Sequence, residues 1–197
     1  MKSVSAQAFR KLLERHIGYD QQAIQAVMER VQPARFKANE RILKVGSVHT
    51  RMYFVGAGYA RHAFRSPELP EEGIMWITFP GDQMANMPSF NSGQPSNTSL
   101  IAITDMDTIF LEKKELIDLY KNYHSFEHFG RVWSEYYLQK MTERAYMLQF
   151  KTARERYELL IGQHPELLQL MPLGHIASYL GMTQETLSRV RSNLNKT

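Results

Sequence analysis

The sequence LGHIASYLGMTQETLSRVRSNL, residues 173–194, predicts two short helices joined by a tight turn. Gly181 can adopt the positive φ that ends one helix and turns the chain sharply. Thr183 can then cap the second helix by accepting a backbone N–H. Apolar residues recur at helical spacing on both sides of the turn: Ile176, Ala177 and Leu180, then Leu187, Val190 and Leu194. This pattern predicts a helix-turn-helix, whose second helix enters the major groove of DNA.

The outer side of the second predicted helix carries side chains that can recognise base edges. Arginine pairs with guanine, glutamine or asparagine with adenine, and glutamate with cytosine. These outward residues are Gln184, Glu185, Ser188, Arg189 and Asn193. The alternative is a helical hairpin that only packs, but the joint placement of the apolar residues and this Arg-bearing face favours DNA binding. Lys151, Arg154 and Arg191 are candidates for phosphate contacts.

Composition limits the class of protein. The 197 residues are enough for one large domain or two small ones. The net charge is only +4, so affinity for nucleic acid must come from local clusters of basic residues. The chain has no cysteine, which excludes disulfides and cysteine-ligated zinc or iron–sulfur clusters. No apolar run approaches the ~18 residues of a membrane span. We therefore expect a cytoplasmic protein without a membrane contact and without a cofactor.

The chain shows a helical region, then many short strands, then a helical region again. Gly56 and Gly58 predict a hairpin turn among the strands. Short strands separated by turn residues are typical of a sandwich or small barrel, such as a jelly roll. The predicted strands are Arg41–Val45, Met52–Val55, Tyr59–Phe64, Ile74–Phe79, Ser99–Ile103 and Thr108–Leu111. The sequence thus predicts an α+β protein with three parts: a β-roll domain with flanking N-terminal helices (1–121), a long dimerisation helix (122–150) and a helix-turn-helix domain (151–197).

The predicted long helix has a heavy load of aromatic residues along one stripe. It could be a core helix that lies on the barrel, or the seam of a dimer. A helix of this length seldom finds enough intramolecular surface, and a helix-turn-helix usually needs two copies to bind two half-sites. We therefore expect a homodimer. The predicted contact residues are Phe129, Trp133, Tyr137, Met141 and Leu148.

This order of elements resembles the Crp/Fnr family of bacterial transcription regulators, in particular its short members from Bacteroidetes-type bacteria. The resemblance is carried by FKANERILKVGSVHTRMYFVGAGYARHAF (36–64) and TARERYELLIGQHPELLQLMPLGHIASYLGMTQETLSRVR (152–191). It implies a cyclic-nucleotide-binding-like β-roll that senses a small molecule of unknown identity, and double-stranded DNA as the partner. RNA polymerase is a candidate further partner. The resemblance adds roles in base recognition and backbone contact to the DNA-binding set, which becomes Thr183, Gln184, Glu185, Thr186, Ser188, Arg189 and Arg191.

The segment GDQMANMPSFNSGQPSNTS, residues 81–99, matches the phosphate-binding cassette of family members that bind cyclic AMP. In those proteins an arginine pairs with the cyclic phosphate and a carboxylate binds the ribose. Here Asn86 occupies the position where the carboxylate is expected, and Ser96 and Asn97 occupy the positions where the arginine-containing pair is expected. The segment has no Lys or Arg, which forfeits a charge-assisted pair worth ~1.5–3 kcal/mol. We expect no cyclic AMP binding, although Arg61 or Arg65 could reach in. The predicted effector-pocket residues are Gly81, Asp82, Asn86, Ser96, Asn97 and Thr98.

Two enzymatic alternatives rest on histidines. His124, Glu127 and His128 match the H-x-x-E-H pattern of zinc peptidases, in which two histidines four residues apart share a helix face. A metal-dependent β-roll of the cupin type would need histidines clustered on adjacent strands, near which lie only His49 and His62. Both patterns lack an evident third ligand, so we expect that the protein is not an enzyme.

Overall fold

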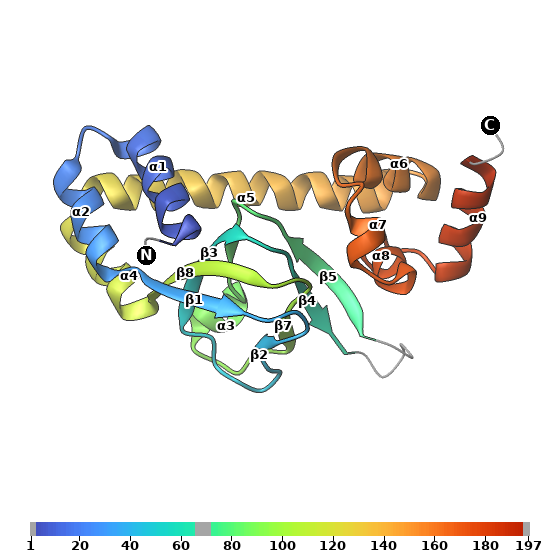
Figure 1. The fold of residues 1–197 in the computed structure, drawn as a ribbon, viewed down its shortest axis with the longest axis horizontal. Helices are drawn as coiled ribbons and strands as arrows, with labels where there is room; N and C mark the ends of the chain where they lie inside the picture. The colour runs from blue at the N-terminus through green and yellow to red at the C-terminus, as the bar shows by residue number, and fades with distance from the viewer. Residues whose placement is uncertain (1–2, 66–71, 195–197) are drawn as a thin grey trace. The chain divides into compact units, whose positions relative to one another are not determined.

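The computed structural model describes residues 3–65 and 72–194, and over these residues the chain folds as two compact units (Figure 1). The first unit comprises Met1–His62 and Thr78–Glu135, and the second comprises Ala63–Ile77 and Tyr136–Thr197. Helices, then strands, then helices follow one another along the chain. This arrangement confirms the predicted α+β class with an N-terminal β-sheet domain and C-terminal helices. None of the helices in the described ranges combines the length and apolar character needed to cross a membrane.

The strands of the described ranges form two four-stranded sheets, with the orders β1-β8-β3-β6 and β2-β7-β4-β5. Their bounds are β1 Gln32–Phe36, β2 Arg41–Leu43, β3 Arg51–Ala57, β4 Ala60–Phe64, β5 Gly73–Thr78, β6 Gln83–Met84, β7 Thr98–Ala102 and β8 Met106–Glu112. Each of the predicted strands is present. Strands β1 and β6 are not among the predicted strands. Pro33 lies within β1, which pairs antiparallel with β8 and forms the edge of its sheet, where a residue without an N–H is tolerated.

The predicted hairpin at Gly56 and Gly58 is wrong. The strands on either side of this turn, β3 and β4, belong to different sheets, so the turn carries the chain from one sheet to the other. Gly58 has φ 88, and a Cβ there would lie 2.4 Å from the carbonyl oxygen of Asp105. Local turn residues predict a reversal of direction, but only the packing of the two sheets decides whether the flanking strands pair.

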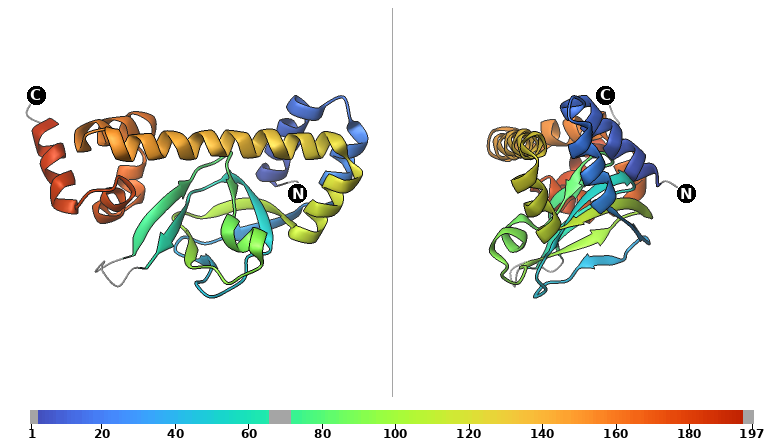
Figure 2. Two further views of the ribbon diagram at one scale, coloured as in Figure 1. Left: turned by 180° about the vertical axis from the view of Figure 1, so that it is seen from behind. Right: turned by 90° about the vertical axis from the view of Figure 1, so that its left-hand side faces the viewer.

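Helices of the first unit cover one face of the β1–β8–β3–β6 sheet. They are α1 Val4–Ile17, α2 Gln21–Arg30, α4 Lys113–Asn122 and the first part of α5 His124–Phe150, while α3 Met87–Ser92 lies between β6 and β7. Figures 1 and 2 show α1, α2 and α4 around the beginning of α5. Their buried residues form one core with the sheet, which includes Phe9, Leu13, Phe54, Ile109 and Phe126. A second cluster fills the interior of the roll, with Leu43, Val55, Met84, Leu100 and Phe110.

Helices dominate the second unit: α6 Ala153–Gln163, α7 Leu167–Leu170, α8 Leu173–Tyr179 and α9 Gln184–Leu194. Thr152 and Glu155 form a capping box at the start of α6. Strand β5 packs with these helices inside the same unit, because the Ile74 N–H donates to Ser178 Oγ at 2.8 Å. Leu187 of α9 is fully buried against this helical cluster, with Ile176 and Leu180.

Candidate functional sites

The stretch 173–194 contains two helices, α8 and α9, on either side of a left-handed glycine. Gly181 has φ 63, as the sequence predicts. Thr183 Oγ1 accepts the N–H of Thr186 at 3.2 Å, which is the predicted N-cap bond of α9. A Cβ at Gly181 would lie 2.9 Å from Leu148 Cδ2, so α5 packs closely against this turn within the second unit.

One side of α9 presents polar side chains to solvent. We define this polar face by Gln184, Glu185, Ser188, Arg189 and Asn193, all of which are exposed. On the opposite side Leu187 is fully buried, while Val190 and Leu194 are half-buried. The first two turns of α9 therefore carry accessible Gln, Glu and Arg side chains, and Leu187 anchors the helix by its apolar side. Of the remaining predicted contact residues, Thr183 is exposed, and Thr186 and Arg191 are half-buried.

The basic residues proposed for phosphate contacts lie at the start of α6 and the end of α9. Arg154 Nε lies 2.8 Å from Glu158 Oε1, and Lys151 Nζ lies 4.0 Å from Glu155 Oε1. Both are i,i+4 pairs on an exposed helix surface, which contribute only ~0.3–0.5 kcal/mol each. Because these pairs are weak, Lys151 and Arg154 can give up their glutamate partners and bind another anion instead.

A half-buried arginine joins α5 to α8 in the second unit. Arg144 Nη2 donates to the carbonyl of Tyr179 at 2.8 Å, and its guanidinium lies 4.0 Å from the centroid of the Tyr179 ring. The ring of Trp76, on β5, lies 6.0 Å from the same guanidinium. Burial lowers the pKa of Arg144 from its usual value. No role for Arg144 follows from the sequence, because nothing local distinguishes it from the other basic residues of the helix.

Residues predicted for the dimer helix fall into two environments. Phe129 is buried in the core of the first unit, and Trp133 packs against that core. Tyr137 is half-buried, whereas Met141 and Leu148 are exposed. A further apolar residue that the prediction omitted, Leu138, is 68% exposed. The predicted contact residues are thus buried or half-buried up to the middle of α5, and those in its second half are exposed.

The predicted effector pocket is a buried network of neutral groups. Asn86 Oδ1 accepts the Ser89 N–H at 2.9 Å as the cap of α3, and Asn86 Nδ2 donates to Thr98 Oγ1 at 2.6 Å. Ser96 Oγ donates to the Thr98 carbonyl at 2.8 Å and accepts the Thr98 N–H at 3.1 Å. Asn86, Ser96 and Thr98 are all buried. Their hydrogen-bonding groups are therefore directed at one another and at the backbone.

The other predicted pocket residues lie at the edges of this network. Gly81, with φ 91, and Asp82 form the turn before β6, where Asp82 Oδ2 accepts the Phe79 N–H at 3.0 Å. Asn97 is exposed. The structure thus brings together Asn86, Ser96 and Thr98, while the other three take part in turns around them.

A cation does approach this end of β7, but it is Arg41 on β2 and neither of the two arginines, Arg61 and Arg65, that the sequence suggested. Arg41 Nη1, on β2, donates to Ser99 Oγ at 3.1 Å. Successive residues of a strand point to opposite faces of the sheet, so Ser99 and Thr98 face in opposite directions. Arg41 therefore lies on the other side of β7 from the Asn86 network.

The two histidines of the β-roll are buried in the first unit. His62 Nε2 lies 3.1 Å from Thr78 Oγ1, and burial lowers the pKa of His62 to about 4. Burial also lowers the pKa of His49, whose ring is tilted at 51° to the Tyr53 ring with the centroids 6.1 Å apart. Both imidazoles are therefore neutral at pH 7.

The zinc-peptidase pattern lies on the first turns of α5. His124 Nδ1 is 3.6 Å from Glu127 Oε2, and Arg131 Nη2 lies 3.0 Å from His128 Nδ1. A guanidinium beside an imidazole opposes the binding of a second cation. Among residues 3–65 and 72–194 no cluster of three or more His, Asp or Glu side chains could hold a metal ion, so neither histidine pattern acquires a third ligand there.

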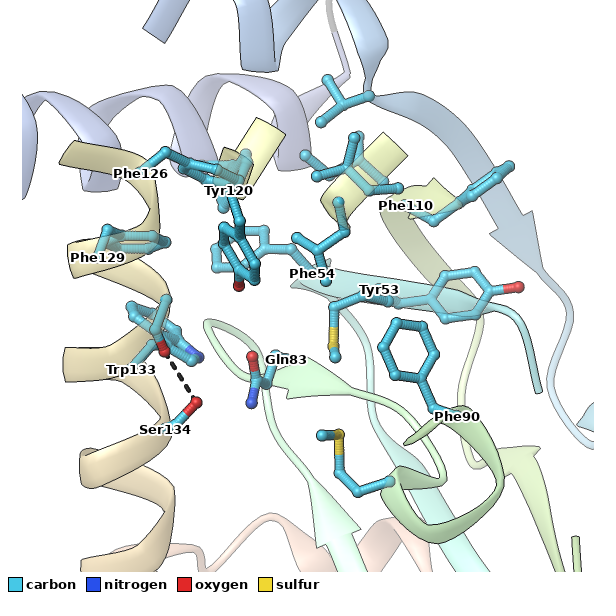
Figure 3. Close-up of a pocket in the computed structure, with 18 of the residues that line it drawn as sticks. Tyr53, Phe54, Gln83, Phe90, Phe110, Tyr120, Phe126, Phe129, Trp133 and Ser134 are labelled. Carbon is cyan, nitrogen blue, oxygen red and sulfur yellow. Dashed lines mark hydrogen bonds between the residues drawn. The ribbon is translucent and has the colours of Figure 1, made fainter. Parts of the chain in front are cut away.

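An apolar cavity lies elsewhere in the first unit, between β3, α3, α4 and the beginning of α5 (Figure 3). Its volume is about 300 Å³, and aromatic rings from each of these elements line it. The aromatic stripe of the long helix was the sequence signal here, and two of its residues, Phe129 and Trp133, line the cavity. The dimer seam that the same stripe predicts stays a prediction.

The chain is similar in sequence to one known domain family. Residues 33–123 match the family model of the cyclic nucleotide-binding domain. The matched segment begins in β1 and ends after α4, so it covers both sheets and α3. No curated protein matches the chain.

Solved structures share the fold of most of this chain. FixK2 from Bradyrhizobium japonicum is 21% identical, with 84% of this chain and 85% of that chain covered and a TM-score of 0.70. The Catabolite Activator Protein of Thermus thermophilus is 20% identical, with coverages of 91% and 85% and a TM-score of 0.55. CLP from Xanthomonas campestris, a c-di-GMP responsive global regulator, is 15% identical, with coverages of 90% and 92% and a TM-score of 0.65. At these identities the likeness establishes a cyclic-nucleotide-binding fold followed by C-terminal helices.

Proposed function

We propose that this chain is a transcription regulator of the Crp/Fnr type, which binds specific DNA sequences as a homodimer. The polar face of α9 is the observation that carries the proposal. It offers Gln184, Glu185 and Arg189 to solvent near the N-terminus of a helix that follows a tight turn. A recognition helix contacts base edges with its N-terminal residues in this way. The shared fold with a catabolite activator protein and with a global regulator of gene expression supports the same role.

Specific base contacts come from the first turns of α9. Arg189 donates to O6 and N7 of guanine, Gln184 pairs with adenine, and Glu185 accepts from the amino group of cytosine. Lys151, Arg154 and Arg191 neutralise phosphates and so add affinity that does not depend on sequence. Thr183 Oγ1 accepts the Thr186 N–H as the cap of α9 and lies 3.0 Å from Thr186 Oγ1. We assign these two residues to the DNA backbone and not to base edges.

Dimerisation uses the second half of α5. Leu138, Met141, Ala145 and Leu148 follow one another at intervals of three and four residues, the heptad spacing of a two-stranded coiled coil. All four are exposed, with Leu138 at 68%, Met141 at 46% and Leu148 at 38%. We name these four residues the α5 seam. A second copy of the chain buries the seam and places two α9 helices for half-sites about one DNA turn (~34 Å) apart.

The β-roll of this regulator does not take cyclic AMP as its effector. The segment 81–99 offers no cation to a phosphate, and the buried groups of Asn86, Ser96 and Thr98 are already paired with one another. A ligand at ~100 times its dissociation constant raises the free energy of unfolding by ~2.7 kcal/mol. Thermal unfolding with and without millimolar cyclic AMP therefore tests whether the β-roll binds this nucleotide. We expect an unchanged melting temperature.

Two experiments test the regulator proposal. The purified full chain is used to select duplexes from a random DNA library, and sedimentation equilibrium gives the mass of the protein in solution. We expect enrichment of a pseudo-palindrome and a dimer in solution. The matched variants are Met141→Glu, which places a charge in the seam, and Gln139→Glu, which places it on an exposed neighbouring position. Met141→Glu should give a monomer with weak DNA binding, and Gln139→Glu should behave as the wild type. A library without enrichment, or equal binding by the two variants, would contradict the proposal.

A further inference from the structure

The apolar cavity of the first unit opens to solvent at the exposed residues Met87, Asn91 and Ser134, and it has room for a small molecule. Protein interiors contain few voids larger than a water molecule, and an engineered cavity of about 150 Å³ already binds benzene. The cavity here has a volume of about 300 Å³. Figure 3 shows aromatic rings on three sides of it, from Phe129 and Trp133 on α5, Phe54 on β3 and Phe90 on α3.

A hydroxyl without a partner points into this cavity. Tyr120, on α4, directs its phenol toward the space between Trp133 and Gln83 in Figure 3. In the described part of the chain this hydroxyl forms no hydrogen bond. Burial raises the pKa of Tyr120 to about 12, so the phenol keeps its proton and is a donor at neutral pH. Gly130 makes room for it, because a Cβ at residue 130 would lie 2.3 Å from the Tyr120 hydroxyl oxygen.

The lining carries no charge. Among the described residues that line the cavity none is Asp, Glu, Lys, Arg or His, and the polar side chains are amides and hydroxyls. Moving an ion from water into such surroundings costs several kcal/mol in folded proteins. The cavity is also separate from the Asn86 network, since Asn86, Ser96 and Thr98 are not among the lining residues. Other residues of the 81–99 segment, Gln83, Met87, Phe90 and Asn91, do line the cavity, but none of them is charged. A charged nucleotide therefore does not fit the chemistry of this lining.

We propose that this cavity binds an uncharged aromatic small molecule that accepts a hydrogen bond from Tyr120. The rings of Phe54, Phe129 and Trp133 contact the faces and edges of the ligand, and the Tyr120 hydroxyl fixes its orientation. One wall of the cavity belongs to α5, whose second half carries the α5 seam. The ligand thus contacts the same helix that pairs two subunits. The link to dimerisation rests on the proposed function.

The test uses calorimetric titration of the full-length protein with three probes of similar shape: 1-naphthol, naphthalene and 1-naphthalenesulfonate. We expect saturable binding of 1-naphthol, weaker binding of naphthalene and none of the sulfonate. Trp133 lies in the wall, so binding of 1-naphthol should also change tryptophan fluorescence. If the sulfonate binds as tightly as 1-naphthol, or if 1-naphthol does not bind, the inference is wrong.

Three variants locate the binding site. Ser134→Trp places a large ring at the cavity and should weaken 1-naphthol binding at least tenfold, whereas Glu135→Trp adds the same ring at the next exposed position of α5 and should leave it unchanged. Tyr120→Phe should weaken 1-naphthol binding about fivefold but leave naphthalene binding unchanged, because only 1-naphthol has an acceptor. Equal affinity in the two Trp variants would place the probe elsewhere. None of these measurements involves DNA, so failure here is distinct from failure of the regulator proposal.

Discussion

Arg144 on α5 donates a hydrogen bond to the carbonyl of Tyr179, in the last turn of α8, and holds its guanidinium 4.0 Å from the centroid of the Tyr179 ring. Carbonyls at the end of a helix lack intrahelical partners, and a basic side chain nearby can satisfy them. A single residue thus fixes the long helix to the helix that precedes α9.

Arg144→Met keeps the apolar stem but removes the hydrogen bond and the cation–π contact. We expect the free energy of unfolding to fall by about 1–2 kcal/mol. Hydrogen exchange should become faster in α8, which mass spectrometry can localise. The control is Arg154→Met, which removes only an exposed pair with Glu158 and should cost less than about 0.5 kcal/mol. Equal effects of the two changes would show that the Arg144 contact adds nothing to stability.

Asn86→Ala removes the cap of α3 and the buried hydrogen bond to Thr98. The loss of a cap together with an unpaired buried hydroxyl should lower the free energy of unfolding by about 2–3 kcal/mol. Asn97→Ala changes an exposed residue of the same segment and should stay within about 0.5 kcal/mol of the wild type. Urea denaturation of both variants is the measurement. A small effect of Asn86→Ala would mean that the network does not hold the cassette together.

The stability should depend on pH through His62. Its pKa in the folded protein is about 4, below the usual 6.5, because burial disfavours the charged form. The unfolded chain therefore binds a proton between these two values that the folded chain does not, and stability falls as the pH drops through this window. For this residue alone we expect a loss of about 2 kcal/mol at pH 5 relative to pH 8.

The neighbouring His49, whose pKa is also lowered by burial, acts in the same direction. Denaturation of the wild type and of His62→Gln at several pH values separates the two contributions, since the variant keeps only that of His49. Exposed His128→Gln is the control and should retain the full slope. Identical pH profiles for wild type and His62→Gln would contradict the assignment.

Two glycine-to-alanine changes should have opposite signs. At Gly181 the backbone has φ 63 and a Cβ would lie 2.9 Å from Leu148 Cδ2, so alanine should destabilise the protein by about 1–3 kcal/mol. Gly162 lies in α6 with open space around it, so alanine there should stabilise by about 0.5–1 kcal/mol. Thermal unfolding of the two variants checks both signs, and two shifts in the same direction would contradict the geometry of the turn.

Arg189→Ala should weaken binding to the selected duplex by about 1–3 kcal/mol and relax the preference at one base position. Arg154→Ala removes the same charge from a proposed phosphate contact and should weaken binding to all sequences alike. Fluorescence anisotropy with the selected duplex and its single-base variants distinguishes these outcomes. If Arg189→Ala leaves affinity and preference unchanged, the polar face of α9 is not the contact surface.

Local patterns in the sequence determined the type of most elements. Alternation and turn residues located six of the eight strands that the described ranges contain, and the turn at Gly181 with its Thr183 cap follows from two residues and their neighbours. The absence of Lys and Arg from residues 81–99 is likewise evident from the sequence alone. These features depend on backbone preferences and residue chemistry, which act over a few positions.

Only the tertiary structure decided which surfaces are buried and which groups meet. It assigned β3 and β4 to different sheets, brought Arg41 to Ser99 and paired Asn86 with Thr98. It also divided the aromatic stripe of α5, burying Phe129 in the core of the first unit while Leu138 and Met141 remain exposed. Periodicity shows that a helix has an apolar face, but not what covers each turn of it, because burial depends on contacts between residues far apart in the chain.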